Sequence, residues 1–364
     1  LTITSIAGFS QTNKIFTDDI DRFWVAYDSL KTIKDSAQKV EVFRSIYVDN
    51  GSEGLHAFMK ERYFPPERMV ALIEQYPKFW NSIRPRTFLV KTKKQEMEAA
   101  IEQLRQWYPE LKEAKMYFTI GGLASGGTTQ KDKVLIGTEI ATGNNEVDVS
   151  EFENDWLATV FAHNDDNQLV TLNIHEYVHT QQRLENESGT LLLGNAILEG
   201  TCDFVSMLIT NTTTLPAHLD YYRKHELELM PIFYNEMFGK ARSNWIGSGG
   251  NINVPMADLG YAIGHEICKF YFDKASDKRL AVKQMIELDY RDSVATVRFL
   301  EQSGYLDYLK TKGFIPQKTE NIEGIKQTKD KVYFVFDASK QVVCYGENQR
   351  KVFDSKNKND IKTV

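Results

Sequence analysis

Five consecutive residues, His175-Glu176-Tyr177-Val178-His179, have the types and the spacing of a zinc-hydrolase site. Two histidines that stand four residues apart on a helix leave it on the same face, so both imidazoles can bind one ion. Glu176 follows the first histidine and would point beside the metal, where a carboxylate holds a water instead of acting as a ligand. The segment therefore predicts a helix that carries a metal-binding pair and a general base.

A catalytic zinc site takes three protein ligands and keeps a fourth position open, so another ligand must come from elsewhere in the chain. Glu199 is the leading candidate, because it lies twenty residues after His179 in an apolar stretch, 191–204, with helical character. Asp203 follows one helical turn later on the same face. Its carboxylate could accept the spare N–H of a ligating histidine and so fix the orientation of the ring.

The alternative is a purely structural role for all four residues. His175 and His179 would then be core histidines on an amphipathic helix, and Glu199 and Asp203 would be ordinary carboxylates near a helix N-terminus. This alternative leaves the joint spacing of the two motifs unexplained, so we favour the metal site.

Together the two motifs resemble those of the gluzincin metallopeptidases, which carry HExxH on one helix and ExxxD about twenty residues later on the next. More narrowly, the residues around both motifs look like the predicted zinc-dependent peptidases of unknown substrate common in Bacteroidetes-type bacteria. Those proteins are similar in turn to a gliding-motility lipoprotein family. With weaker matches at 21–24, 117–122 and 260–264, the resemblance spans about residues 15–310.

The resemblance implies two further features. A small sheet should lie above the active-site helix and pair its edge strand with an extended substrate, a role assigned to the strands around Thr119 and Ile136. A Tyr or His from a helix beyond the third ligand should stabilise the oxyanion. Tyr261 and His265 fit this role, since they lie one helical turn apart in Gly260-Tyr261-Ala262-Ile263-Gly264-His265, whose glycines allow close backbone approach. In the alternative, Tyr261 is a packing aromatic and His265 is solvated.

Composition and charge limit the class of protein. The chain has 364 residues, of which 42% are hydrophobic and 26% charged, enough for one large globular domain or two modest ones. The net charge of -6 makes nucleic acid an unexpected partner. No apolar run approaches the roughly 20 residues of a membrane helix, so no transmembrane segment is expected. Cys202, Cys268 and Cys344 are too scattered for a disulfide framework or a thiolate metal site, and we expect them to be small buried residues.

The N-terminal stretch 1–11 is apolar and rich in small residues before the chain turns polar. This texture is typical of the back half of a secretory signal peptide, although a first β-strand is the alternative. No cysteine follows the stretch directly, so a bacterial lipid-attachment site is not expected there. We therefore expect export to the periplasm or the extracellular space without an anchor.

The apolar periodicity predicts a mainly α chain with a small β-sheet, an α+β fold. Through the resemblance it is zincin-like, with the HExxH helix under a small mixed sheet and a helical C-terminal part. Strands are expected at 115–120 and 134–138, and a hairpin at 331–345. The glycine-rich stretch 121–129 is not a phosphate cradle, because it lacks a Gly-Lys-Ser/Thr ending and leads into a strand.

Four regions result from this organisation. They are a signal-peptide remnant and linker (1–14), an N-terminal helical region (15–112), a zincin-like catalytic region (113–313) and a C-terminal β-hairpin appendage with a polar tail (314–364). The remaining histidines have no partner spacing and are expected at the surface: His56, His163, His218 and His225. A bulky apolar group is expected in the core rather than in a substrate pocket: Ile232, Phe233, Met237 and Phe238.

The sequence therefore predicts a secreted zinc-dependent peptidase that hydrolyses a peptide or protein substrate with metal-activated water, with Zn2+ as its cofactor. One alternative is a non-catalytic envelope protein that keeps the zincin fold as a binding module, and the intact HExxH argues against it. The other is a zinc hydrolase of a small amide, because no sequence feature fixes the length of the substrate.

Overall fold

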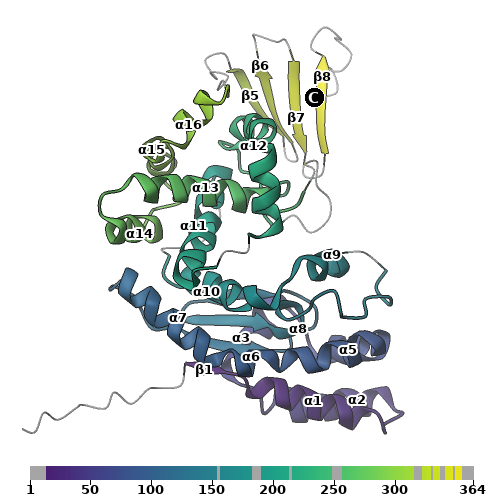
Figure 1. Ribbon diagram of the computed structural model, residues 1–364. Coiled ribbons are helices and arrows are strands. Elements are labelled where there is room, and N and C mark those ends of the chain that lie inside the picture. The colour runs from purple at the N-terminus through teal and green to yellow at the C-terminus, as the bar shows by residue number, and fades with distance from the viewer. Residues whose placement is uncertain are drawn as a thin grey trace, which may run out of the picture. The chain divides into compact units, whose positions relative to one another are not determined.

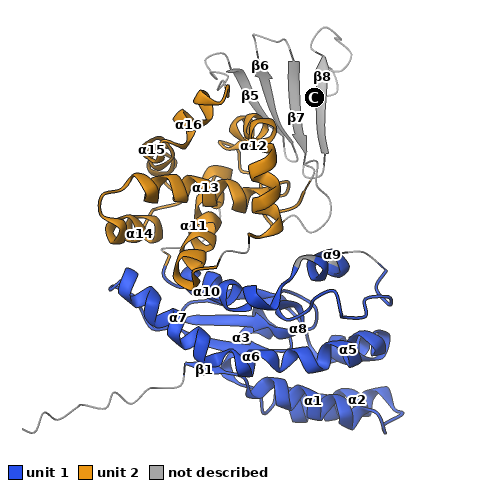
Figure 2. Cartoon of the chain, viewed as in Figure 1, with its two compact units in different colours: residues 1–181 blue, residues 182–364 orange. Residues whose placement is uncertain are grey.

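The structure is a computed structural model that describes residues 14–153, 156–182, 190–212, 215–247 and 256–314, together with the backbone of four strands between 322 and 354 (Figure 1). The chain forms two compact units, residues 1–181 and residues 182–364 (Figure 2). This division falls inside the region that the sequence assigns to catalysis. The expected signal-peptide remnant and linker cover residues 1–14, of which 1–13 lie outside the described residues, so export stays a prediction.

Unit 1 is mainly helical. Its helices are α1 (Asp18–Leu30), α2 (Ser36–Phe43), the π-helix η1 (Arg44–Val48), α3 (Glu53–Arg62), α4 (Pro66–Gln75), α5 (Pro77–Thr87), α6 (Leu89–Thr92), α7 (Lys94–Trp107), α8 (Thr138–Ala141), α9 (Trp156–His163), the 3-10 helix η2 (Asp166–Gln168) and α10 (Leu169–His179). Pro66 and Pro77 begin their helices because the first helical position needs no N–H partner. The Asp35 and Ser52 side chains cap α2 and α3 by accepting a backbone N–H of the first turn.

The sheet of unit 1 is mixed, with strands β1 (Ile15–Phe16), β2 (Lys115–Thr119), β3 (Gly127–Gln130) and β4 (Lys133–Gly137) in the order β1-β2-β4-β3. β1, β2 and β4 run parallel, and β3 runs antiparallel to β4. Both predicted strands are therefore present, as β2 and β4. They are interior strands, however, so the expectation that the strands around Thr119 and Ile136 offer an edge to substrate is wrong. Within the described residues the edges are β3 and the short β1.

Aromatic side chains hold the helices of unit 1 together. The centroid of the Phe23 ring on α1 lies 5.5 Å from the ring centroid of Tyr47 on η1 and 5.2 Å from that of Trp80 on α5. The neighbouring Trp24 donates its indole N–H to the Thr87 hydroxyl at 2.9 Å. Such contacts between large buried rings supply much of the apolar burial that fixes helices on one core.

The described residues of unit 2 first form the helices α11 (Leu192–Thr210), α12 (Ala217–Glu236), α13 (Leu259–Lys274), α14 (Lys278–Ile286), α15 (Ser293–Ser303) and α16 (Tyr305–Thr311). A four-stranded antiparallel sheet follows, made of β5 (Ile322–Thr328), β6 (Lys331–Phe336), β7 (Gln341–Gly346) and β8 (Gln349–Asp354). β6 and β7 pair along the segment that the sequence reads as a hairpin, and β5 and β8 flank them.

The contact between α11 and α13 depends on glycine. A Cβ atom on Gly264 would lie 1.7 Å from the Ala196 carbonyl oxygen, and one on Gly200 would lie 2.0 Å from the Gly264 carbonyl carbon. The two backbones therefore touch at a distance that only glycine permits. The expected close backbone approach at Gly264 is confirmed, and it fixes the face of α13 that turns away from α11.

α11 is long and apolar enough, by length and composition, to cross a membrane. It has 19 residues and a mean hydropathy of 1.4 in its most apolar window, and 78% of that window is buried. The sequence-based statement that no apolar run approaches this length is wrong for α11. Its burial is that of a core helix, whose two apolar faces pack on neighbouring helices.

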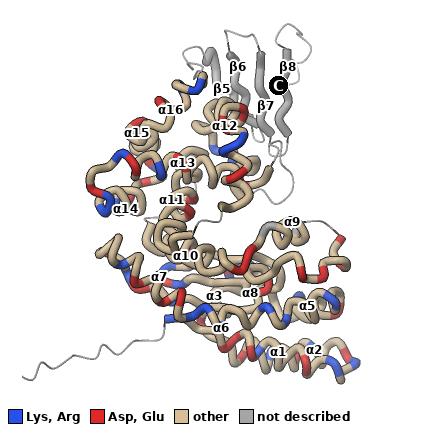
Figure 3. Tube along the Cα trace, in the orientation of Figure 1, with Lys and Arg blue, Asp and Glu red and all other residues tan. Residues whose placement is uncertain are grey.

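Acidic and basic residues are interspersed over the helices of each unit (Figure 3). Many of them pair along one helix three or four residues apart, as Lys93 does with Glu96 at 2.9 Å and Lys224 with Asp220 at 2.6 Å. Exposed pairs of this kind each contribute little to stability. The burial of apolar and aromatic side chains therefore dominates the stability of the fold.

Gly264→Ala should lower the free energy of unfolding by about 1–3 kcal/mol, because the added methyl group forces α11 and α13 apart. Denaturant unfolding of the purified variant measures the change. Gly239→Ala is the matched control, since a Cβ there would meet only the Glu236 carbonyl oxygen, at 3.1 Å. Equal stability of Gly264→Ala and the wild type would show that the helices are not in this contact.

Candidate metal centre

His175 and His179 bring their Nε2 atoms to 3.1 Å from each other on α10, with ring planes 78° apart. Two nitrogens that each lie 2.0–2.1 Å from a tetrahedral zinc are about 3.3 Å apart. The pair thus has the spacing of two ligands of one ion without any rearrangement of the helix. This is the geometry that the four-residue spacing predicts.

His175, His179 and Cys202 make up a group of side chains that could hold a metal ion. The sequence predicts that Cys202 is a small buried residue outside any metal site. It is fully buried on α11, but the expectation that it takes no part in a metal site is wrong, because it belongs to this group. Its position three residues after Glu199 places both side chains on one side of that helix, which is the signal that could have identified it. Glu199, the predicted third ligand, is partly exposed. Histidine and cysteine donors suit zinc and several other transition metals alike.

Glu176, the predicted general base, lies against the first residue of the edge strand β3. A Cβ atom on Gly127 would stand 2.7 Å from Glu176 Oε1 and 2.9 Å from its Cγ. A Cβ at this position would therefore force the Glu176 side chain to move. No pattern in the sequence distinguishes Gly127 from the other glycines of the glycine-rich stretch.

The glycine-rich stretch 121–129 binds a carboxyl group of the protein itself. Glu139 on α8 is fully buried, and its two carboxylate oxygens accept the N–H of Gly121 at 3.0 Å. The N–H of Leu123 donates to the same carboxylate at 2.9 Å. These backbone donors are engaged by Glu139, which agrees with the sequence argument against a phosphate cradle. Burial raises the pKa of Glu139 to about 7, although the hydrogen bonds from Gly121 and Leu123 lower it.

In unit 2, three helices bring together a polar group that the sequence only partly anticipates. Asp203 Oδ2 on α11 lies 3.3 Å from His218 Nε2 on α12, and the His218 ring lies 6.0 Å from that of Tyr261 on α13. The side chain of His218 is 23% exposed, so it lies only partly at the surface. Nothing in the spacing of the sequence relates residue 218 to residues 203 or 261, because the relation arises only when the helices pack.

His265 occupies a different environment from Tyr261. It is 4% exposed, its Nδ1 lies 3.2 Å from Glu266 Oε1, and its ring packs on Phe204. Glu266 also accepts two hydrogen bonds from Arg223, at 2.9 and 2.7 Å. Burial would raise the pKa of Glu266, but His265 and Arg223 hold it below its usual range. The alternative of a solvated His265 is wrong, since the ring belongs to this interior ion-pair network.

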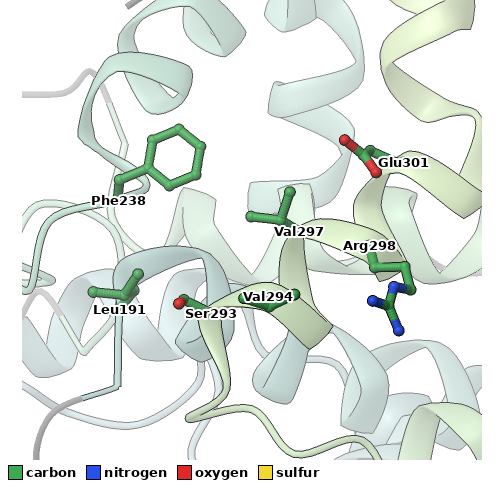
Figure 4. Close-up of a pocket in the computed structure, with 7 residues that line it drawn as sticks. All are labelled: Leu191, Phe238, Ser293, Val294, Val297, Arg298 and Glu301. Carbon is green, nitrogen blue, oxygen red and sulfur yellow. The ribbon is translucent and has the colours of Figure 1, made fainter.

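The other histidines and the apolar group complete the comparison. His56 is exposed, as expected, His225 is partly exposed, and the side chain of His163 lies outside the described residues. Phe233 and Met237 are in the core, whereas Phe238 is 41% exposed. Phe238 lines a groove of about 430 Å³ in unit 2, shown in Figure 4, with Leu191, Val294, Val297, Arg298 and Glu301. None of the predicted site residues lines this groove.

No protein-family model, curated protein or solved structure matches the chain. The resemblance to gluzincins therefore rests on the two sequence motifs.

Glu139 should make the stability of the protein depend on pH. Its pKa in the folded protein is about 7, above the usual 4.5, so the folded protein holds this proton more tightly than the unfolded chain does. The contribution is then complete below about pH 4.5 and is lost as the pH rises towards about 7. The stability of wild type relative to Glu139→Gln should fall across this window, by up to about 1.4 kcal/mol per pH unit. Urea unfolding at a series of pH values measures the difference, and a difference independent of pH would contradict the assignment.

Proposed function

We propose that this chain is a zinc-dependent peptidase that hydrolyses peptide bonds with water and uses Glu176 as the general base. The observation that carries the proposal is the 3.1 Å separation of the Nε2 atoms of His175 and His179 on one helix, with Glu176 between them in the chain. An acidic residue next to a histidine pair of this spacing is the arrangement that metal-assisted hydrolysis requires.

The ligand set that we propose is His175, His179 and Glu199. The spacing of HExxH and ExxxD supports Glu199, and a carboxylate completes the set of three ligands that leaves one position open for water. Cys202 is the alternative third ligand, supported by its membership of the metal-binding group. A zinc ion held by these residues would lower the pKa of a bound water to about 7.

Glu176 would accept the proton of the attacking water and pass it to the leaving amine. Gly127 leaves space for this carboxylate at the start of β3. The outer edge of β3 offers backbone N–H and C=O groups to an extended peptide, which favours a peptide over a small amide as the substrate. This assignment moves the substrate-binding edge from β2 and β4, named by the resemblance, to β3.

Tyr261 is the residue that we assign to the developing oxyanion. Its phenol ring lies beside His218, which the carboxylate of Asp203 orients in turn. A donor held by such a chain of contacts is pre-organised for the charge that forms when water attacks a carbonyl. His265 receives no such role, because Glu266 and Arg223 hold it in the interior of unit 2.

Purified protein should carry about one zinc ion per chain and lose it in a His175→Ala, His179→Ala double variant, because a single remaining protein ligand cannot retain the ion. Elemental analysis measures the metal, and an unbiased peptide-library digest measures the activity of the loaded protein. A His56→Ala, His225→Ala double variant removes one exposed and one partly exposed histidine and should keep both zinc and activity.

The third ligand is decided by the same measurement. Glu199→Ala should lose zinc and Cys202→Ala should keep it. The reverse result would assign the thiolate, and a cobalt-loaded protein would then show a thiolate charge-transfer band that Cys202→Ala removes. Unchanged zinc in the histidine double variant would rule out the metal site, and zinc without cleavage of any library peptide would leave only a binding module or a small-amide hydrolase.

Tyr261→Phe should lower kcat and kcat/KM together by about 10²-fold or more and leave zinc content and KM nearly unchanged, because only the oxyanion donor is lost. Steady-state kinetics on a peptide taken from the library digest test this. Tyr271→Phe on the same helix is the control, since its hydroxyl donates to Gln284 at 2.8 Å in an exposed position. Full kcat in Tyr261→Phe would remove Tyr261 from the mechanism.

A further inference from the structure

The loop from Ile120 to Gly127 is held at its first end by two buried side chains from other elements. The Tyr47 hydroxyl on η1 donates to the Ile120 carbonyl at 2.8 Å and accepts the Ile120 N–H at 2.9 Å. Glu139 accepts the N–H groups of Gly121 and Leu123 directly after it. Hydrogen bonds from side chains, and not the backbone pairing of a β-sheet, therefore determine the conformation in which the loop begins.

The second end of the loop is tied to strand β4. The Gly137 N–H donates to the Gly126 carbonyl at 3.1 Å, and the Ser125 hydroxyl donates to the Gly127 carbonyl at 2.6 Å. A Cβ on Gly137 would lie 2.1 Å from the Ser125 carbonyl oxygen, so the loop lies directly on the strand. Gly127 then meets the Glu176 side chain. A continuous series of contacts thus connects Glu139 to Glu176.

The loop contains conformations that are unfavourable for an isolated chain. Gly122 has φ of 62° and Leu123 has φ of 54°, and the left-handed region is strained for a leucine. The carboxylate that holds Leu123 is itself costly, because burial of a charged group far from water is unfavourable unless hydrogen bonds satisfy it. An apolar side chain in the place of Glu139 would leave the N–H groups of Gly121 and Leu123 without this acceptor. The combination of the strained loop and the buried carboxylate points to a requirement on the exact course of the loop.

We propose that Glu139 is a positioning residue for Glu176, an inference that rests on the proposed function. The Glu139 carboxylate fixes the turn at Gly121 and Leu123, the turn fixes the start of β3, and Gly127 holds the Glu176 carboxylate in the orientation that accepts a proton from water. Glu139 touches neither the metal ligands nor the substrate edge in this scheme, and its effect on the reaction passes through Gly127.

The test is a double-mutant cycle between Glu139→Gln and Gly127→Ala on the zinc-loaded full-length protein. Each single variant should keep about one zinc per chain, and kcat should fall about 10-fold with a smaller change in KM, because the base is displaced while the hydrogen-bonding groups of β3 remain. The double variant should be no slower than the slower single variant, since both changes disturb one element. Amide hydrogen exchange should speed up at Gly121 and Leu123 in Glu139→Gln.

Asp19→Asn is the matched control. Asp19 is also a buried carboxylate of unit 1, but it accepts the N–H and the hydroxyl of Ser52 and so holds the start of α3 instead of the loop. Its kcat should stay within about twofold of wild type. If Glu139→Gln does not fold, Glu139→Asp replaces it, since the shortened carboxylate keeps the charge and loses the reach to at least one N–H.

The outcomes separate the two proposals. A wild-type protein that binds zinc and cleaves no peptide overturns the proposed function. It also overturns the positioning role of Glu139, which rests on that function. An active wild type whose Glu139 variants keep full kcat, or whose kcat losses simply multiply with that of Gly127→Ala, overturns the positioning role alone. Unchanged exchange at Gly121 and Leu123 in the Glu139 variants overturns it as well, because the carboxylate would then not hold the loop.

Discussion

The geometry of one helical turn in α10 is the constraint on which the functional account depends. A rotation of about 40° and a rise of about 6 Å between residues four apart bring the two imidazole Nε2 atoms to 3.1 Å. The residue after the first histidine then points to a neighbouring face of the helix, towards β3. The position of the Glu176 side chain against Gly127 follows from this placement.

The glycine-rich loop shows how a protein can build an anion site and fill it with its own side chain. Backbone N–H groups in a turn attract a carboxylate as readily as a phosphate. Here Glu139 takes that place inside unit 1, so the loop becomes a rigid support between β2 and β3. In unit 2 the contact of Gly200 and Gly264 has a comparable role, because it sets the face of α13 on which Tyr261 lies.

Local patterns in the sequence predicted several helices and strands. The strand order and the partners of single residues depend on long-range packing and were not predicted. Apolar periodicity identified α10, α11, α13 and the strands β2 and β4, since each pattern lies within one segment. Strand order is not written in such patterns, so the edge was assigned to the wrong strands. Glu139 and His218 acquire their partners only through folding. A single Glu or His without a partner at helical spacing carries no pattern that would predict such a role. His265 has helical spacing from Tyr261, but its ring is hydrogen-bonded to the carboxylate of its neighbour Glu266.

The most direct test of the central claim is the turnover of zinc-loaded Glu176→Gln on a peptide that the wild type cleaves. The substitution keeps the size of the side chain and removes only its ability to accept a proton. The account predicts one zinc per chain in both proteins and a kcat that is about 10²- to 10⁴-fold lower in the variant. Turnover of the variant at the wild-type rate, with equal zinc content, would contradict the assignment of Glu176 as the base and with it the proposed mechanism.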